Sequence, residues 1–222
     1  MNEMKKDKAF ARKQAVIWIL SLLPLVLAAA VYSRLPAQIP TNWGVNGEVS
    51  YGSKNNIWII AGMSPLMAGL FQVLPAIDPK KKNYQKFPEV YQSFQLFMQV
   101  FLLVTTAIII TESFRPGTIH VSAVITAMCG ILFMTFGNML PKFRQNFFCG
   151  FKTPWALSDE TVWNKTHRLG GRLMFGAGIL GFAGAFLPDD RAKILLLVLP
   201  LTAATVIPYI MSYVWFRQIS RE

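Results

Sequence analysis

Charged residues and the residue types of catalytic centres are scarce in this sequence. Of its 222 residues only 15% are charged, and it has two histidines and two cysteines. An average soluble domain has about 25% charged residues. Because a chain this poor in charge has too few groups to keep a globular surface hydrated, the composition argues against a soluble enzyme and a disordered regulator. Two cysteines also argue against a disulfide scaffold.

The sequence motifs of common catalytic sites are missing as well. The chain has no GxGxxG or GxxxxGK[ST] motif and no Ser/His/Asp cluster. Cys129 lies in an apolar run and Cys149 in a polar loop, so we expect no disulfide between them. His120 and His167 are expected on opposite sides of a membrane, which excludes a shared zinc site. We therefore predict no catalytic residue, no metal, no cofactor and no enzymatic activity.

Apolar residues, by contrast, make up 53% of the chain and gather in six runs. A membrane-spanning helix needs about 20 apolar residues, and lipid offers no hydrogen-bond partner to a broken backbone. The sequence therefore predicts an all-α integral membrane protein with a single six-helix domain over residues 1–222. The predicted spans are residues 14–33, 57–77, 92–111, 119–140, 169–187 and 194–214.

The first span shares features with a secretory signal peptide. A basic segment precedes it, and Ala28, Ala29 and Ala30 resemble a cleavage site. Its apolar residues continue past these alanines to Tyr32, so a retained helix is favoured over a cleaved one.

The distribution of lysine and arginine predicts the orientation of the chain. Sixteen of them lie in the two terminal tails and in the loops after the second and fourth spans, whereas five lie in the other three loops. Because cytoplasmic loops of membrane proteins are enriched in Lys and Arg, both termini are predicted to be cytoplasmic. The net charge of +11 is interpreted as topology signals and contacts with membrane lipids, not as direct binding to nucleic acid.

Ionisable residues are missing from the middle of every predicted span. Proton- and ion-coupled transporters need such groups at midplane depth, so transport is disfavoured. Gln92, Gln95 and Gln99 fall on one helix face of the third span, and Gln72 is in the second. Hydrogen bonding between helices is the favoured interpretation, and lining of a polar cavity is the alternative. Small residues spaced four apart in the fifth span predict a close helix contact, within the bundle or between protomers.

The loop of residues 34–56, on the predicted outer side, is rich in Gly, Pro and Asn. Pro36 and Pro40 favour extended backbone, and Asn46-Gly47 and Gly52 are turn signals. We expect a small hairpin at the membrane surface that is either a structured connector or an extracellular contact surface. The apolar side chains expected to enter the interface are Ile39, Trp43, Val45 and Tyr51.

The loop of residues 141–168, on the predicted cytoplasmic side, is expected to be irregular and basic at first and helical later. Ser158 is predicted to cap this helix, with Asp159 and Glu160 in its first turn. Trp163 and His167 are one turn apart and share a helix face. Three interpretations remain for the loop: an interfacial connector, a protein-docking surface and, least favoured, catalysis by His167.

The residues of this second loop resemble the signature of the SdpI family, which are bacterial membrane immunity proteins against a sporulation-delaying toxin. The resemblance lies in Gly137-Asn138, Pro141, Asn146, Phe148, Gly150, Thr153-Pro154-Trp155, Leu157-Ser158, Val162-Trp163 and Thr166-His167-Arg168, followed by Gly170-Gly171.

The outer loop resembles the domain of unknown function that often precedes that signature. The matching residues are Leu35-Pro36, Ile39-Pro40-Thr41, Trp43, Gly47 and Tyr51-Gly52-Ser53-Lys54. Two departures occur. Asn42 stands where family members often have histidine, and Val49-Ser50 precede Tyr51 where an acidic residue is usual. Since asparagine does not protonate near neutral pH, the departures argue against a metal-binding or pH-sensing role for this loop.

The resemblance implies protection of the cell from a secreted toxin peptide. It also implies signalling, in which the protein holds an ArsR-type repressor at the plasma membrane. By the same resemblance, partner binding is assigned in the cytoplasmic loop to Asn138, Pro141, Asn146, Gly150, Thr153, Pro154, Trp155, Trp163, Thr166, His167 and Arg168. Outer contacts are assigned to Pro36, Ile39, Pro40, Trp43, Tyr51 and Lys54. A transporter of small solutes or toxin and an integral-membrane enzyme are the alternative functions.

Overall fold

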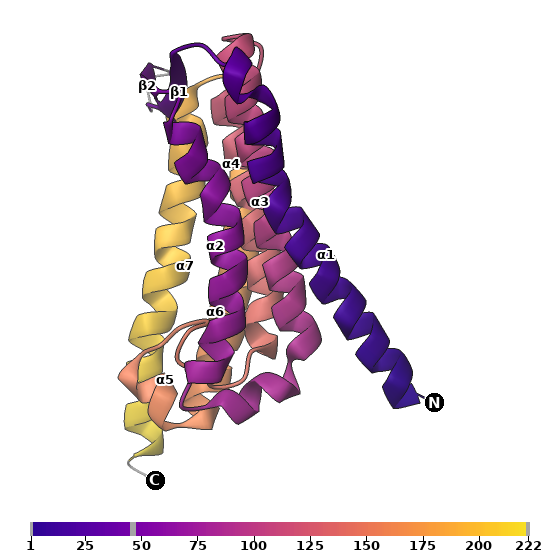
Figure 1. The fold of residues 1–222 in the computed structure, drawn as a ribbon. Coiled ribbons are helices and arrows are strands. Elements are labelled where there is room, and N and C mark those ends of the chain that lie inside the picture. The colour runs from indigo at the N-terminus through magenta and orange to yellow at the C-terminus, as the bar shows by residue number, and fades with distance from the viewer. Residues whose placement is uncertain (1, 45–47, 221–222) are drawn as a thin grey trace. The chain divides into compact units, whose positions relative to one another are not determined.

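The computed structural model of the chain is mostly helical and describes residues 2–44 and 48–220, with residues 2–7 described as backbone only (Figure 1). The predicted turn at Asn46-Gly47 and the side chain of Val45 lie outside the described residues. The long helices are α1 (Asn2–Val31), α2 (Asn56–Ile77), α3 (Pro88–Phe114), α4 (Val121–Met139), α6 (Glu160–Gly184) and α7 (Asp190–Ile219). The short elements are η1 (Tyr32–Arg34), β1 (Gln38–Trp43), β2 (Val49–Ser53), η2 (Lys81–Lys86), η3 (Leu140–Lys142) and α5 (Pro154–Ser158).

Five helical segments of the described chain are long and apolar enough to cross a membrane. They are Lys8–Arg34, Asn56–Ile77, Pro88–Phe114, Val121–Lys142 and Asp190–Ile219. These segments confirm the prediction of an all-α membrane protein. The remaining predicted span, residues 169–187, falls in α6, which starts earlier and ends at Gly184. Because α6 begins with a charged stretch and is rich in glycine, its composition alone does not mark it as a span.

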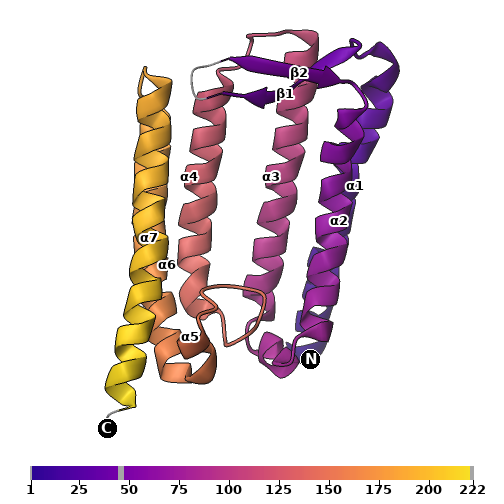
Figure 2. The ribbon, with the colours of Figure 1, turned by 90° about the vertical axis from the view of Figure 1, so that its left-hand side faces the viewer.

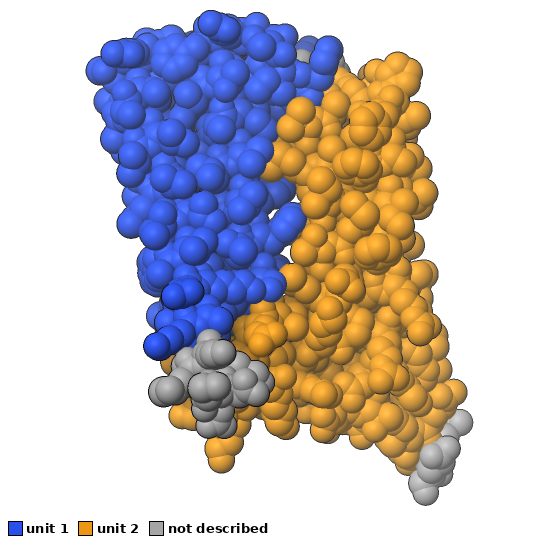
Figure 3. Space-filling model, turned by 90° about the vertical axis from the view of Figure 1, so that its right-hand side faces the viewer, with its two compact units in different colours: residues 1–73, 91–121 blue, residues 74–90, 122–222 orange. Residues whose placement is uncertain are grey.

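The chain forms two compact units (Figure 3). Unit 1 consists of residues 1–73 and 91–121 and holds α1, the β-hairpin and most of α2 and α3. Unit 2 consists of residues 74–90 and 122–222 and holds α4 to α7 together with the loop between α2 and α3.

In unit 1 the predicted hairpin is present. Strands β1 and β2 pair antiparallel, with Gln38 opposite Ser53, and a bulge interrupts β1 between Pro40 and Asn42. The hairpin links the end of η1 to the start of α2 (Figure 2). Ile39 is fully buried in a cluster with Ile57 and other apolar residues of the helix ends. The expectation of a turn at Gly52 is wrong, because this residue lies inside β2, where it pairs with Ile39.

The glutamine row of unit 1 forms hydrogen bonds between helices, as the favoured interpretation predicted. Ser64 Oγ donates to Gln99 Oε1 over 2.6 Å, and Gln72 Nε2 donates to Gln95 Oε1 over 3.1 Å. Gln92 Nε2 donates to the carbonyl of Phe10 in α1. Buried amides inside a bundle need such partners, because lipid offers none.

In unit 2 the small residues of α6 make contacts inside the chain. A Cβ added at Gly178 would lie 2.5 Å from the backbone nitrogen of Met134 and 2.6 Å from the carbonyl oxygen of Gly130, both in α4. Helix α6 also meets α7, where a Cβ at Gly181 would lie 2.3 Å from Leu197. The close contact predicted for the fifth span is therefore made, at these positions, with α4 and α7 of the same chain.

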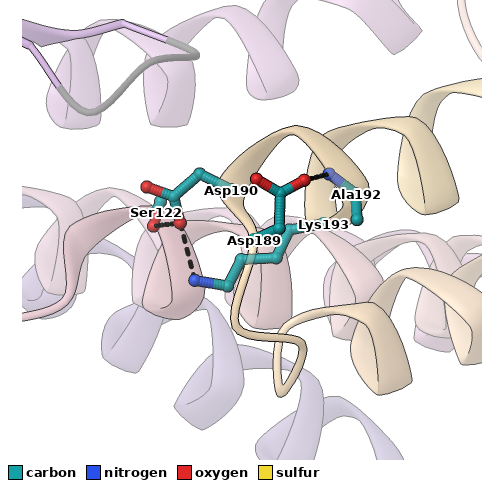
Figure 4. Close-up of polar contacts among 5 residues, drawn as sticks. All are labelled: Ser122, Asp189, Asp190, Ala192 and Lys193. Atoms are coloured by element: carbon teal, nitrogen blue, oxygen red, sulfur yellow. Dashed lines mark hydrogen bonds and ion pairs between the residues drawn. The ribbon is translucent and has the colours of Figure 1, made fainter.

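The start of α7 is tied to α4 by a small polar cluster (Figure 4). Asp189 caps α7 by accepting from the backbone N–H of Ala192. Asp190 pairs with Lys193 over 2.6 Å and accepts a hydrogen bond from the hydroxyl of Ser122 in α4. The Lys193 side chain is only 8% exposed, so this carboxylate compensates a charge that would otherwise be buried alone.

Candidate functional site

The loop that joins α4 to α6, residues 140–159, is held at both of its helical turns by side-chain caps. Thr153 accepts from the N–H of Ala156 and starts α5, with Pro154 in its first turn. Asp159 accepts from the N–H of Val162 and starts α6. The prediction that Ser158 caps the helix is therefore wrong. Ser158 ends α5, and its hydroxyl donates to the carbonyl of Trp155, which leaves the carboxylate of the next residue to cap α6.

His167 is fully buried beneath this loop. Its ring stacks on that of Trp163, with ring centroids 3.9 Å apart, which confirms the predicted shared face. His167 Nε2 accepts from the backbone N–H of Phe151 over 3.0 Å, so Nδ1 carries the proton and faces the carbonyl of Trp163 at 2.9 Å. Burial lowers the pKa of His167 to about 4. The imidazole is therefore neutral near pH 7, and both of its nitrogens are occupied, which leaves none for acid–base catalysis.

Gly150 lets the loop approach this histidine. Its φ of +102° belongs to a region that residues with a side chain rarely adopt, and an added Cβ would lie 2.1 Å from His167 Nε2. Trp163 completes the attachment, since its Nε1 donates to the carbonyl of Phe143 over 2.9 Å. The loop is thus fastened to α6 through backbone groups at positions 143 and 151.

Two buried side chains, Asn146 and Asp78, accept hydrogen bonds from backbone N–H groups in the middle of the loop. Asn146 is fully buried, and its Oδ1 accepts from the N–H groups of Phe148 and Cys149. Asp78, which follows α2, accepts from the N–H of Phe147 over 2.8 Å and from the hydroxyl of Tyr84 over 3.0 Å. Asp78 therefore joins the α2–α3 loop to the α4–α6 loop inside unit 2.

The sequence did not predict the role of Asp78 or the contact of Lys80 with Gln145, whose Nζ and Oε1 are 2.5 Å apart. One signal was available for Asp78. It is an acid directly after a span, followed by Pro79 and a run of lysines, and Asp-Pro pairs favour turns. No local pattern identifies Gln145, which is 65 residues from its lysine partner.

The assigned residues of the cytoplasmic motif separate into a buried set and an exposed set. Asn146, Thr153, Trp163, Thr166 and His167 are buried, while Gly150 and Trp155 are half-buried. The exposed members are Asn138, Pro141, Pro154 and Arg168. Further basic residues are exposed around them: Lys142, Arg144, Lys152, Lys165 and Arg172. Four of the buried residues, Asn146, Thr153, Trp163 and His167, form hydrogen bonds with backbone groups of the loop, whereas the exposed set lies on the surface of unit 2.

The assigned outer residues divide in the same way. Ile39 and Pro40, both in β1, are buried, and Trp43 is half-buried. Lys54 is also half-buried, with its ammonium 4.7 Å from the centre of the Tyr32 ring. Pro36 is exposed, and Tyr51 is 50% exposed. Pro36 and Tyr51 are thus the most accessible of the six.

The cysteines show no sign of redox or metal chemistry. Both are free, and burial raises the pKa of Cys149 to about 11, which keeps it a thiol at neutral pH. Within residues 2–44 and 48–220, no group of three or more His, Cys, Asp or Glu side chains is placed to hold a metal ion.

Two segments of the chain are similar to known protein families. Residues 142–212 match the SdpI/YfhL protein family, and residues 19–64 match a domain of unknown function, DUF1648. The segment that resembles the SdpI/YfhL family thus follows the segment that resembles DUF1648 along the chain. It is also similar to the Immunity protein SdpI of Bacillus subtilis (strain 168), at 24% identity over 94% of this chain and 98% of that protein. No solved structure matches the chain.

These matches confirm the predicted SdpI resemblance. The SdpI/YfhL match begins at Lys142, the last residue of η3. It covers the rest of the α4–α6 loop, including α5, then α6 and most of α7, all within unit 2. The DUF1648 match covers the second half of α1, the hairpin and the start of α2, all within unit 1. Together with the long apolar helices, these similarities make the chain a multi-pass protein of the cell membrane.

Proposed function

We propose that this protein is a membrane immunity protein that protects its cell from a secreted toxin peptide. The observation that carries the proposal is the similarity, over 94% of the chain, to a protein named as an immunity protein. The occupied nitrogens of His167 support a role in binding over catalysis, because they remove one of the two residues, His167 and Asn138, on which an enzymatic alternative depended.

The proposed topology has six spans in one membrane domain, with α6 supplying the additional span from Leu169 onward. Both termini and the α4–α6 loop then face the cytoplasm. The excess of Lys and Arg on that side supports this orientation. His167 and the basic residues around it precede the apolar part of α6 and lie at the cytoplasmic surface in this topology.

We assign toxin contact to the outer hairpin, and in particular to the open edge of β2. Lys54 N–H donates to the carbonyl of Ala37, and the carbonyl of Glu48 accepts from the N–H of Gly44. The peptide groups of the two residues that flank β2 therefore point toward the chain of β1. Because peptide groups alternate in direction along an antiparallel strand, those of Val49, Tyr51 and Ser53 point to the other edge. The side chains of these three residues are exposed. An extended peptide adds to such an edge through main-chain hydrogen bonds, and its side chains then contact those of the edge strand, Tyr51 among them.

Expression in a toxin-sensitive strain is expected to raise survival against at least one member of a panel of secreted membrane-active peptides. Y51A is expected to lower the tolerated toxin concentration by roughly tenfold, because truncating a contact aromatic costs about 1–2 kcal/mol of binding. F186A is the matched control, since Phe186 is an aromatic residue 75% exposed at the end of α6, outside the hairpin. Survival equal to that of an empty vector across the panel would contradict the immunity function. Equal protection by Y51A and wild type would contradict the hairpin assignment alone.

For signalling, we propose that the exposed basic face of the α4–α6 loop holds an ArsR-type repressor at the membrane. Arg144, Lys152 and Arg168 are exposed, so the repressor surface that meets them is expected to be less basic than its DNA-binding face and separate from it. The charge-reversal variant R144E/K152E/R168E is expected to lower the membrane-bound fraction of a co-expressed repressor by about tenfold. R34E/R115E/R191E, which reverses three exposed arginines elsewhere, is expected to leave that fraction unchanged. Intact capture by the first variant would rule out an electrostatic role for this face.

A further inference from the structure

The loop between α2 and α3 carries a basic hollow that none of the functions above uses. It is lined by Pro79, Lys80, Lys81, Lys82 and Asn83, together with Gln145 of the α4–α6 loop, and has a volume of about 360 Å³. All six residues belong to unit 2. The volume falls within the range of small-molecule sites, about 300–1,000 Å³.

The hollow is built around a lysine that is held in place. Lys80 Nζ donates to Gln145 Oε1 over 2.5 Å and to the carbonyl of Leu157 over 3.0 Å. An ammonium group has three N–H donors, so one remains for a ligand. Asn83 is positioned in the same way, because its Nδ2 donates to the carbonyl of Gln145 over 2.8 Å and has a second hydrogen to offer.

The positive charge of the hollow is not neutralised by the acid next to it. Asp78 is only 2% exposed, and it accepts from the N–H of Lys80, the N–H of Phe147 and the hydroxyl of Tyr84. Lys81 and Lys82 are exposed. In the part of the chain that the structure describes, the three lysines of the hollow form no ion pair with a carboxylate.

The position of the hollow favours a membrane lipid over a soluble anion as the source of a negatively charged ligand. Helices α2 and α3 are both long and apolar enough to span the membrane, and residues 79–83 follow the end of α2 by two residues or more. They therefore lie at the depth of the lipid headgroups. Basic pockets at this depth bind the headgroups of anionic phospholipids.

We propose that this hollow is a binding site for the phosphate of an anionic phospholipid headgroup. Lys81 and Lys82 supply most of the attraction, while the Lys80 ammonium and the Asn83 amide orient the phosphate oxygens. A bound headgroup would also bridge the α2–α3 loop to Gln145, and so stabilise the α4–α6 loop of the same unit. This site is independent of the proposed immunity function, since it depends only on the chain being embedded in a bilayer.

The site is tested by native mass spectrometry of the 222-residue chain. The protein is released from detergent in the presence of phosphatidylglycerol or of phosphatidylcholine of equal chain length. Wild type is expected to retain phosphatidylglycerol over phosphatidylcholine. K81Q/K82Q is expected to weaken phosphatidylglycerol retention by about tenfold, while Lys80 and its hydrogen bonds stay in place. K142Q/K165Q removes the same charge from two exposed lysines outside the hollow and is expected to bind like wild type.

Three results would overturn the proposal. Equal weakening in both variants would mean diffuse attraction to the basic surface, without a site. Equal retention of the two lipids by wild type would mean no selectivity for an anionic headgroup. Displacement of phosphatidylglycerol by inorganic phosphate would assign the hollow to a soluble phosphate compound.

Discussion

Alanine in place of Gly178 is expected to destabilise the helical bundle of unit 2 by about 2–3 kcal/mol, because its methyl group would overlap backbone atoms. The added Cβ would lie 2.5 Å from the nitrogen of Met134 and 2.6 Å from the carbonyl oxygen of Gly130. Backbone atoms of a packed helix have no rotamer by which to move aside, so α4 and α6 must separate. A lower melting temperature in detergent is the expected observation.

G176A is the matched control for this variant. Gly176 lies two residues earlier in the same helix, and a Cβ there would meet nothing within 4 Å. Unfolding is followed with a thiol-reactive fluorophore, since Cys149 is buried in the loop that packs on α6 and becomes reactive when that loop opens. Equal melting temperatures for G178A and G176A would show that α4 and α6 do not approach at this glycine.

Acidification is expected to weaken the attachment of the α4–α6 loop through His167. The pKa of this histidine is lowered by burial from 6.5 to about 4, so between these values the unfolded chain binds a proton that the folded chain does not. Its contribution is therefore fully present above pH 6.5 and is lost as the pH falls toward 4. The loss amounts to about 3 kcal/mol, at 1.36 kcal/mol for each unit of pKa.

H167Q separates this contribution from those of other titrating groups. Glutamine does not titrate. As the pH falls from 6.5 to 4, wild type is therefore expected to lose more stability than H167Q. H120Q is the matched control, because His120 is exposed. The measurement is the melting temperature of each variant as a function of pH. Identical pH profiles for wild type and H167Q would contradict a neutral, buried His167.

Where the pattern of a few neighbouring residues decides burial, the sequence was a reliable guide. The runs that form α1, α2, α3, α4 and α7 were recognised because the bilayer imposes one simple requirement on every span. The hairpin followed from prolines in an extended segment, and the shared face of Trp163 and His167 followed from the helical repeat. The interhelical hydrogen bonds of Gln95 and Gln99 followed from the cost of burying an amide in lipid.

The errors arose where two local solutions compete. Ser158 and Asp159 are both suitable caps, and the choice depends on the short helix α5, which the sequence did not reveal. The local preference of Gly52 is for a turn, but its pairing with Ile39 places it in a strand. The number of spans depends on α6, whose charged beginning and glycine content weaken its hydropathy signal.

The sequence by itself determined the membrane class, the position of most helices and the resemblance to the SdpI family. Only the tertiary structure showed that five of the eleven assigned motif residues are buried, with Asn146 and His167 binding backbone groups of the loop. It alone brought Asp78 to Phe147, which lies 69 residues away, and Lys80 to Gln145. The physical reason is that hydropathy and helical periodicity report only whether a residue is buried. Which distant group satisfies a buried donor or acceptor depends on how the helices and loops pack.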